Sequence, residues 1–189
     1  MSLSDLIFWN AFHEKGIDIA AGVSDTYKHW VSEADERRCK ICKEMTGKIW
    51  YLDELPDPEP PIHPNCRCDI QKMETILAGT ATANKHDGAD WMLKYKGELP
   101  EYYIEYDDIK ALGWRKGKIP SNFAPGKMYT GGIYRNDNKH LPDKSGRIWH
   151  EADINYEQGE TRNSQRIVWS DDGLIFVTYD HYETFNEII

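Results

Sequence analysis

The sequence has no cysteine beyond residue 68, no long apolar run, and few cations for its acidic content. The missing thiols exclude cysteine-dependent catalysis from the last two thirds of the chain. No stretch approaches the roughly 20 apolar residues that a membrane-spanning helix needs, so we expect no membrane partner. With 23 Lys and Arg against 32 Asp and Glu, the formal net charge is −9. A broad basic surface for nucleic acid is therefore excluded, and any RNA must be held by a local cluster of cations.

Common catalytic and targeting motifs are missing as well. Residues 73–189 contain no GxSxG, no P-loop and no metal-ligand spacing. The start of the chain, MSLSDLIFWNAF, lacks the cationic region and the long apolar core of a secretory signal. Any export is therefore expected to need either a region that has been removed or a route that does not read this start.

The composition nevertheless favours a packed protein, because 40% of the residues are apolar and 12% are aromatic. A length of 189 residues suits one large domain or two small ones. The stretch LPDPEPPIHPN holds five of the nine prolines, which predicts an ordered loop or a semi-rigid spacer. We predict a small cysteine- and histidine-rich segment over residues 1–72 and a larger domain over residues 73–189.

Hydrophobic periodicity and turn residues predict the elements of each segment. In the first segment we expect a helix over 4–16 with Ser4 as its N-cap, a strand over 26–33, a short helix over 35–48 that stops at Gly47, and a strand over 48–52. In the second we expect helices over 73–97, broken near Gly79, and 106–113, then strands over 131–136, 147–156, 166–170 and 174–181. This order predicts an α+β domain, with helices packed on one face of an antiparallel sheet.

All four cysteines lie between residues 39 and 68. Cys39 and Cys42 form a CxxC hook, and HPNCRC supplies a second hook with His63, Cys66 and Cys68. Two such hooks are typical of tetrahedral zinc sites that stabilise a fold. We predict Cys39, Cys42, His63 and Cys66 as ligands of a structural zinc ion, with Cys68 as the replacement for the histidine. The alternatives are two disulfides or four free thiols, and a catalytic zinc ion is not expected.

Around these residues the sequence resembles a phage protein family. The stretches DERRCKICKEMTGK and HPNCRC are similar to the C-terminal region of minor head proteins of the phage Mu F type, over roughly residues 25–70. In that family the region accompanies head assembly and DNA injection, and in some bacteria it is fused to toxins. The resemblance implies a role in carriage and nothing catalytic.

Four charged residues of the second segment suit phosphodiester chemistry. His181 ends an apolar strand pattern, Glu151 interrupts another, and Arg162 and Arg166 lie four apart in TRNSQR. A carboxylate and an imidazole can act as base and acid, and two arginines can bind a phosphate and its developing charge. RNA carries its own nucleophile in the 2′-hydroxyl, so no metal is required. Each residue also has an ordinary interpretation as a surface or packed side chain, and the arginines could pair with Asp153.

From about residue 85 to residue 189 the chain resembles the barnase-like bacterial ribonucleases. The similar stretches are DGADWMLKYKGELP, IKALGW, APGK, LPDKSGRIWHEADINY, RNSQRI and DGLIFVTYDHYETF. The resemblance implies that Glu151 is the general base and His181 the general acid. It implies that Arg162 and Arg166 hold the scissile phosphate, with Tyr182 beside the acid. The implied product is a 2′,3′-cyclic phosphate, formed without a catalytic cofactor.

The sequence departs from the family pattern at two places near the phosphate. Tyr106 stands where the family has a catalytic lysine, and Lys110, one turn along, is a candidate substitute. The turn GETRN is one residue longer than the family's, which affects the placement of Arg162. The resemblance also implies a structural ion pair between Arg147 and Asp172.

A third departure lies in the base-binding loop IYRNDNKHLP. The resemblance implies that Tyr134, Asn136 and Tyr182 contact the substrate. Asp137 and Asn138 replace the arginine and glutamate that read guanine in the family. Because an amide cannot accept two guanine donors as a carboxylate does, a strong guanine preference is not expected.

Two classes of function follow. The first is a metal-independent endoribonuclease of single-stranded RNA, the toxic part of a larger phage-derived or polymorphic toxin with a cognate immunity protein. Such a chain is expected to be monomeric, made in the bacterial cytoplasm and exported as part of the larger toxin. The second is a catalytically inactive interaction or phage head-associated module, which the missing lysine favours and the four retained site residues oppose. A zinc-containing nucleic-acid-binding module is weaker, because residues 1–72 carry 9 Lys and Arg against 13 Asp and Glu.

Overall fold

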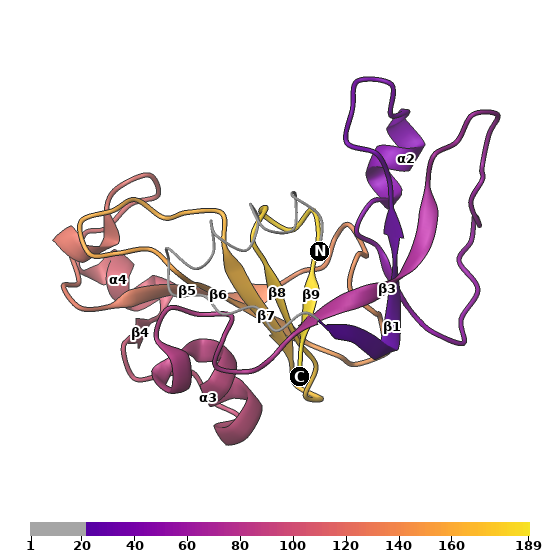
Figure 1. The fold of residues 1–189 in the computed structure, drawn as a ribbon. Coiled ribbons are helices and arrows are strands. Elements are labelled where there is room, and N and C mark those ends of the chain that lie inside the picture. The colour runs from indigo at the N-terminus through magenta and orange to yellow at the C-terminus, as the bar shows by residue number, and fades with distance from the viewer. Residues whose placement is uncertain (1–21) are drawn as a thin grey trace, which may run out of the picture.

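The computed structural model describes residues 22–189, so the helix predicted over residues 4–16, with its N-cap at Ser4, lies outside the described residues. The described part forms one nine-stranded sheet in the order β2-β1-β3-β9-β8-β7-β6-β5-β4 (Figure 1). Three α-helices accompany the sheet within these residues. Strands from both predicted segments therefore share one sheet.

The first segment contributes three strands and a short helix. These are β1 (Gly22–Val31), α2 (Lys40–Met45), β2 (Ile49–Tyr51) and β3 (Asp69–Ile76). The predictions of β1, α2 and β2 are confirmed. The N-cap of α2 is Cys39, whose Sγ accepts a hydrogen bond from the backbone N–H of Cys42. At Gly47, where φ is 83°, an added Cβ would overlap the backbone oxygen of Glu183, so this turn packs directly against the second segment.

The helix predicted over residues 73–97 is wrong in its first part. Residues 73–76 end the strand β3, and the helix α3 (Ala89–Lys96) begins only after a short 3-10 helix, η1 (Lys85–Asp87). Met73 and Thr75 are buried while Glu74 is exposed, which is the alternation of a strand. β3 pairs with β1 on one side and with β9 on the other. Partners distant in the sequence therefore decide the structure of this stretch.

The second segment follows the predicted pattern more closely. Its remaining elements are β4 (Tyr103–Ile104), α4 (Tyr106–Ala111), η2 (Pro120–Asn122), β5 (Met128–Tyr134), β6 (Trp149–Asp153), β7 (Arg166–Ser170), β8 (Ile175–Thr178) and β9 (Asn186–Ile188). The predicted second helix and the four predicted strands are confirmed as α4 and as β5 to β8. β9 runs parallel to β3, and β4 runs parallel to β5. The α+β class therefore holds, but the helices are few and the sheet is mixed rather than antiparallel.

Apolar side chains pack on both faces of the sheet. Ile167 and Val177 belong to the core that α3 covers, whereas Val168 and Phe176 belong to a second core that includes Tyr27 of β1. Neighbouring residues of a strand point to opposite faces, so the two cores lie on opposite sides of the sheet. The first segment thus shares a core with the second. A division of the chain at residue 72 remains a proposal about folding units.

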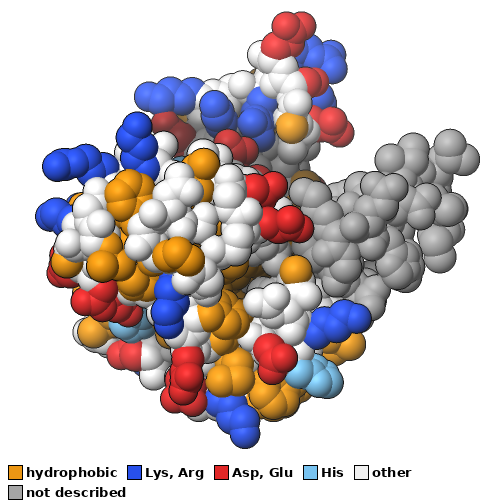
Figure 2. All heavy atoms as spheres, turned by 90° about the vertical axis from the view of Figure 1, so that its left-hand side faces the viewer, with side chains coloured by type: hydrophobic (Ala, Val, Ile, Leu, Met, Phe, Trp, Pro, Cys, Tyr) orange, Lys and Arg blue, Asp and Glu red, His pale blue; other side chains and the backbone are white. Residues whose placement is uncertain are grey.

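The surface carries charges of both signs. On the face that bears α4, acidic and basic side chains are interspersed with apolar ones, and Lys and Arg gather toward one edge (Figure 2). Arg147 and Asp172 form the expected ion pair, with Nε and Oδ1 2.8 Å apart, and this hydrogen-bonded partner holds the pKa of Asp172 well below its usual range. Among residues 22–189 there is no helix with both the length and the apolar character needed to cross a membrane.

Candidate active site

Glu151 projects from the central strand β6, next to a glycine of the neighbouring strand β5. β6 pairs with β5 and β7, and Glu151 lies opposite Gly132 and Val168. An added Cβ at Gly131 would lie only 2.2 Å from Glu151 Oε1. The absence of a side chain at Gly131 therefore lets the carboxylate rest against β5, where it is partly exposed.

Tyr182 holds the Glu151 carboxylate from the other side. Its hydroxyl donates a hydrogen bond to Glu151 Oε2 at 2.5 Å. Burial raises the pKa of Tyr182, and the hydrogen bond to Glu151 raises it further. The ring of Tyr134 stacks on the ring of Tyr182, with centroids 5.0 Å apart. Tyr182 therefore remains a proton donor at neutral pH and fixes the direction of the carboxylate.

His181 lies in a tight loop directly after β8. Both His181 and Tyr182 have positive φ values, 62° and 70°, a backbone conformation that non-glycine residues adopt mainly at special sites. Thr178 Oγ1 accepts the backbone N–H of Tyr182, and the carboxylate of Asp180 accepts the N–H groups of Glu183 and Thr184. These bonds fix the backbone of the loop and leave the His181 imidazole exposed. Its ring centroid is 4.9 Å from that of Tyr182.

Asp180 is a positioning residue that sequence reasoning missed. A usable signal was present, since an aspartate shortly before a turn often accepts backbone N–H groups a few residues later. In DHYET the two residues that Asp180 binds are three and four positions along. The sequence could therefore have indicated the loop, although not its role in holding His181.

Asp153 orders the two arginines as the sequence suggested. Its carboxylate accepts hydrogen bonds from Arg162 Nε at 2.5 Å and Nη2 at 2.7 Å. Arg166 Nε lies 2.9 Å from Asp153 Oδ1, an ion pair without hydrogen-bond geometry, and Arg166 Nη1 donates to backbone oxygens. Burial raises the pKa of Asp153, and the two guanidinium groups oppose this rise. In the described part of the chain, Nη1 of Arg162 and Nη2 of Arg166 have no hydrogen bond, and the Arg162 side chain is the more exposed of the two, at 24% against 5%.

The predicted base-binding loop is held by its own amides. Asn136 is buried with φ at 50°, and its side chain exchanges two hydrogen bonds with the backbone of Leu141. Asn138 Oδ1 accepts the backbone N–H of His140 at 3.2 Å. Both amides therefore shape the loop, and the half-buried ring of Tyr134 lines the cavity together with them.

The position of the missing lysine is apolar. Tyr106 packs edge-on against Trp114 and Tyr129. The ammonium of Lys110 lies over the Tyr106 ring, 5.4 Å from its centroid. Lys110 as a substitute cation remains a hypothesis, because this contact places it on Tyr106 rather than on a site residue.

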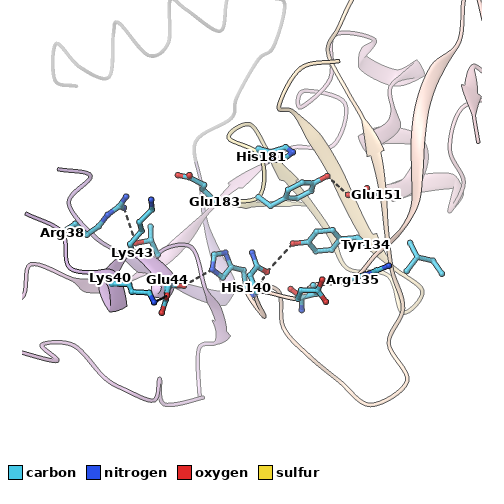
Figure 3. Close-up of a pocket in the computed structure, with 16 residues that line it drawn as sticks. Arg38, Lys40, Lys43, Glu44, Tyr134, Arg135, His140, Glu151, His181 and Glu183 are labelled. Carbon is cyan, nitrogen blue, oxygen red and sulfur yellow. Dashed lines mark hydrogen bonds and ion pairs between the residues drawn. The ribbon is translucent and has the colours of Figure 1, made fainter. Parts of the chain in front are cut away.

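A cavity of about 1070 Å³ gathers most of the predicted site. Tyr134, Asn136, Glu151, His181 and Tyr182 line one side of it, which we call the sheet wall. The opposite side, which we call the α2 wall, is lined by residues of the first segment: Arg38, Lys40, Lys43, Glu44 and Thr46 (Figure 3). Arg162 and Arg166 do not line this cavity; Asp153 links them to the neighbouring end of β6.

The cysteine and histidine hooks converge beside the α2 wall. The Sγ atoms of Cys39 and Cys42 each lie 3.3 Å from His63 Nε2, and Cys42 Sγ lies 3.9 Å from Cys66 Sγ. Ligands of one tetrahedral zinc ion are expected about 3.5–3.8 Å apart, given bonds of about 2.3 Å to sulfur and about 2.0 Å to nitrogen. All four cysteines are free thiols, and Cys68 groups with Cys42 and Cys66. The donors fit a metal ion, with Cys68 and His63 both within reach.

Comparison with known proteins assigns both segments. Residues 63–189 match the family model described as ribonuclease, and residues 11–71 match the model of phage Mu protein F like proteins. A ribonuclease of Heyndrickxia coagulans is 47% identical over 111 residues, 57% of this chain and 99% of that protein. A ribonuclease of Bacillus intermedius is 47% identical over 111 residues, which cover 67% of it.

Among solved structures, ribonuclease Sa2 with guanosine-2′-cyclophosphate is 26% identical, covers 46% of this chain and 94% of its own, and gives a TM-score of 0.29. The family match spans about two thirds of the chain, and the matched residues include Glu151 and His181, which line this cavity. The chain belongs to the ribonuclease family and is an endoribonuclease whose N-terminal segment is of the phage Mu F type.

Proposed function

We propose that this endoribonuclease cleaves single-stranded RNA by transphosphorylation. The observation that carries the proposal is that Glu151 and His181 line one cavity and are bridged by Tyr182. Glu151 takes the proton of the 2′-hydroxyl, and the 2′-oxygen attacks phosphorus. The bond from phosphorus to the 5′-oxygen breaks, and His181 protonates that oxygen. The products are a 2′,3′-cyclic phosphate and a free 5′-hydroxyl, and hydrolysis of the cyclic phosphate then uses the two residues in reversed roles.

The two arginines stabilise the charge of this reaction. Within residues 22–189, Arg162 and Arg166 each keep one guanidinium nitrogen without a hydrogen bond, Nη1 and Nη2 respectively. Charged donors of this kind are worth a few kcal/mol when they are aimed at developing negative charge. No metal ion is needed for these steps, because both proton carriers and the cations belong to the chain.

Base recognition rests on stacking in this proposal. Tyr134 and Tyr182 form a stacked pair in the cavity, a surface on which any base can lie. Asp137 is exposed, and the Asn138 carbonyl oxygen is already bonded to the loop backbone. We therefore infer weak discrimination among bases, with Asn136 acting through the shape of the loop.

The N-terminal segment suggests a carrier and a metal. The Mu F-type match of this segment supports a role of the whole chain as the toxic part of a larger toxin. Such a toxin would need a cognate inhibitor protein in the producing cell. We propose a structural zinc ion held by Cys39, Cys42, His63 and Cys66, with Cys68 as the alternative to His63. The ion would join the two hooks of a segment that has little core of its own.

The test is digestion of a single-stranded RNA of mixed sequence, with the product ends read by mass spectrometry. Wild type is compared with Glu151→Gln and His181→Ala, and the exposed His86→Ala and Glu157→Gln serve as controls far from the cavity. We expect cyclic-phosphate ends from wild type and both controls, and a loss of at least about 1000-fold in each site variant. Intact RNA after hours with micromolar wild type would support the inactive interaction module instead.

A further inference from the structure

The cavity has a second wall that lies outside the residues matched by the ribonuclease family model. Its cations, Arg38, Lys40 and Lys43, all precede residue 63, where the ribonuclease match begins. Figure 3 shows them across the cavity from Glu151 and His181. They come from the N-terminal side of α2 and from α2 itself. The Mu F-type segment thus borders the space in which RNA is proposed to react.

The α2 wall is fixed to the loops of the sheet wall. The backbone N–H of Ile49 donates to the backbone oxygen of His140 at 2.8 Å, and His140 Nε2 lies 3.2 Å from the backbone oxygen of Glu44. On the other side, Gly47 touches the backbone of Glu183, two residues after His181. The segment therefore contacts both the base-binding loop and the loop of the general acid.

The cations of the α2 wall are available to a ligand. Within residues 22–189, Lys43 has no ion-pair partner, and Arg38 donates only to the hydroxyls of Ser32 and Thr46, at 3.3 and 3.5 Å. Lys40 pairs loosely with Glu44 at 3.7 Å, with both side chains largely exposed. Such pairs are weak and exchange readily for a phosphate.

We propose that Arg38 and Lys43 bind the phosphates of nucleotides flanking the cleaved bond, so that the Mu F-type segment forms one half of the RNA-binding cleft. This inference rests on the proposed ribonuclease function of the sheet wall. The cavity volume of about 1070 Å³ is at the upper end of the range of about 300–1,000 Å³ for small-ligand sites, and both walls line this one space. In a chain of net charge −9, a local pair of cations beside the catalytic groups is what RNA requires.

The test compares substrates with and without flanking phosphates. The variant Arg38→Gln/Lys43→Gln is assayed on a dinucleoside monophosphate and on an eight-nucleotide RNA. Arg37→Gln/Lys72→Gln removes the same charge from the same segment outside the cavity and is the matched control. We expect kcat/KM on the longer RNA to fall about 10- to 100-fold, mainly through KM, with no change on the dinucleoside. The dependence of log KM on log salt should also become shallower by about one for each lost contact.

A second measurement keeps the inference independent of catalysis. Binding of a fluorescent 2′-O-methyl octanucleotide, which cannot be cleaved, is followed by anisotropy at several salt concentrations. If wild type cleaves no RNA but Arg38→Gln/Lys43→Gln binds this probe more weakly than Arg37→Gln/Lys72→Gln does, the phosphate subsite stands and the proposed reaction fails. Equal losses on both substrates, or unchanged binding of the probe, would overturn the subsite. Unchanged RNA binding would also leave Arg38 and Lys43 as a surface for an acidic protein.

Discussion

The two walls of the cavity are built in different ways. The sheet wall carries its proton carriers on or beside strands with fully buried neighbours, Val168 and Phe176, and Tyr182 and Asp180 hold them by hydrogen bonds. The α2 wall is built around the six-residue helix α2, in which only Cys42 is buried. Isolated helices of this length are unstable in water. The sheet wall therefore owes its geometry to the core, whereas the α2 wall depends on its cysteine and histidine hooks and on its contacts with the other wall.

The largest effect is expected on stability, at the buried ion pair of Asp153 and Arg166 on the strands next to the sheet wall. Asp153→Asn would leave the cation of Arg166, whose side chain is 5% exposed, without its partner. Breaking a buried pair on one side costs about 3–5 kcal/mol, so urea unfolding should show a loss of this size. The control is Asp172→Asn, which should cost less because the Asp172 carboxylate is 33% exposed against 1% for Asp153, so water can replace it beside the buried Arg147. Equal losses would mean that burial of Asp153 does not set the strength of its ion pairs.

The next effect is on activity alone. Gly131→Ala places a methyl group against the Glu151 carboxylate, as the distance of 2.2 Å requires. The backbone at Gly131 does not have positive φ, so the fold should tolerate alanine. A displacement of about 1 Å can cost about 100-fold, and we expect kcat on a dinucleoside substrate to fall by this order with the melting temperature nearly unchanged. Full activity would show that the carboxylate can move away from β5 without cost.

Loss of zinc should impair the α2 wall and leave the chemistry of the sheet wall unchanged. Cys39→Ser, Cys42→Ser, His63→Ala and Cys66→Ser are each expected to lose bound zinc, measured per chain by mass spectrometry, while Cys68→Ser retains it. Because the sheet wall needs no metal, Cys42→Ser should still cleave a dinucleoside and lose about 10-fold on an eight-nucleotide RNA. Zinc retained by His63→Ala but lost by Cys68→Ser would reverse the choice of the fourth ligand. Equal losses of activity on both substrates would show that the walls do not fold independently.

The same contrast explains what the sequence could predict. β5 to β8 and α4 have local signals, such as alternating apolar residues between turns, and the structure has them. β3 and β9 are decided by pairing with each other and with β1 and β8, which no short window contains. Glu151 and His181 were predicted from the strand pattern and given roles through the resemblance, whereas the support from Gly131 and the α2 wall itself needed contacts between residues far apart in the chain.

His140 joins the two walls and carries the smallest expected effect. It is 7% exposed, and it bonds to the backbone of the α2 wall through its ring and to β2 through its carbonyl. Burial lowers the pKa of His140, with a further contribution from Lys48, while the Glu44 carbonyl and the charge of Asp180 act in the opposite direction. The balance disfavours a proton on His140 in the folded chain.

A histidine whose pKa is lowered by folding binds its proton more readily in the unfolded chain. Its contribution to stability is therefore complete above the ordinary pKa of about 6.5 and declines as the pH falls below that value toward the folded pKa. Between pH 7.5 and pH 5 the wild type should lose more free energy of unfolding than His140→Gln, which cannot be protonated. His29, which is partly buried and also has a lowered pKa, is present in both proteins, so its effect cancels in the difference. Parallel pH profiles would mean that protonation of His140 is compensated in place, and that contacts other than the His140 ring, such as the backbone bond of Ile49 and the contact at Gly47, hold the walls together.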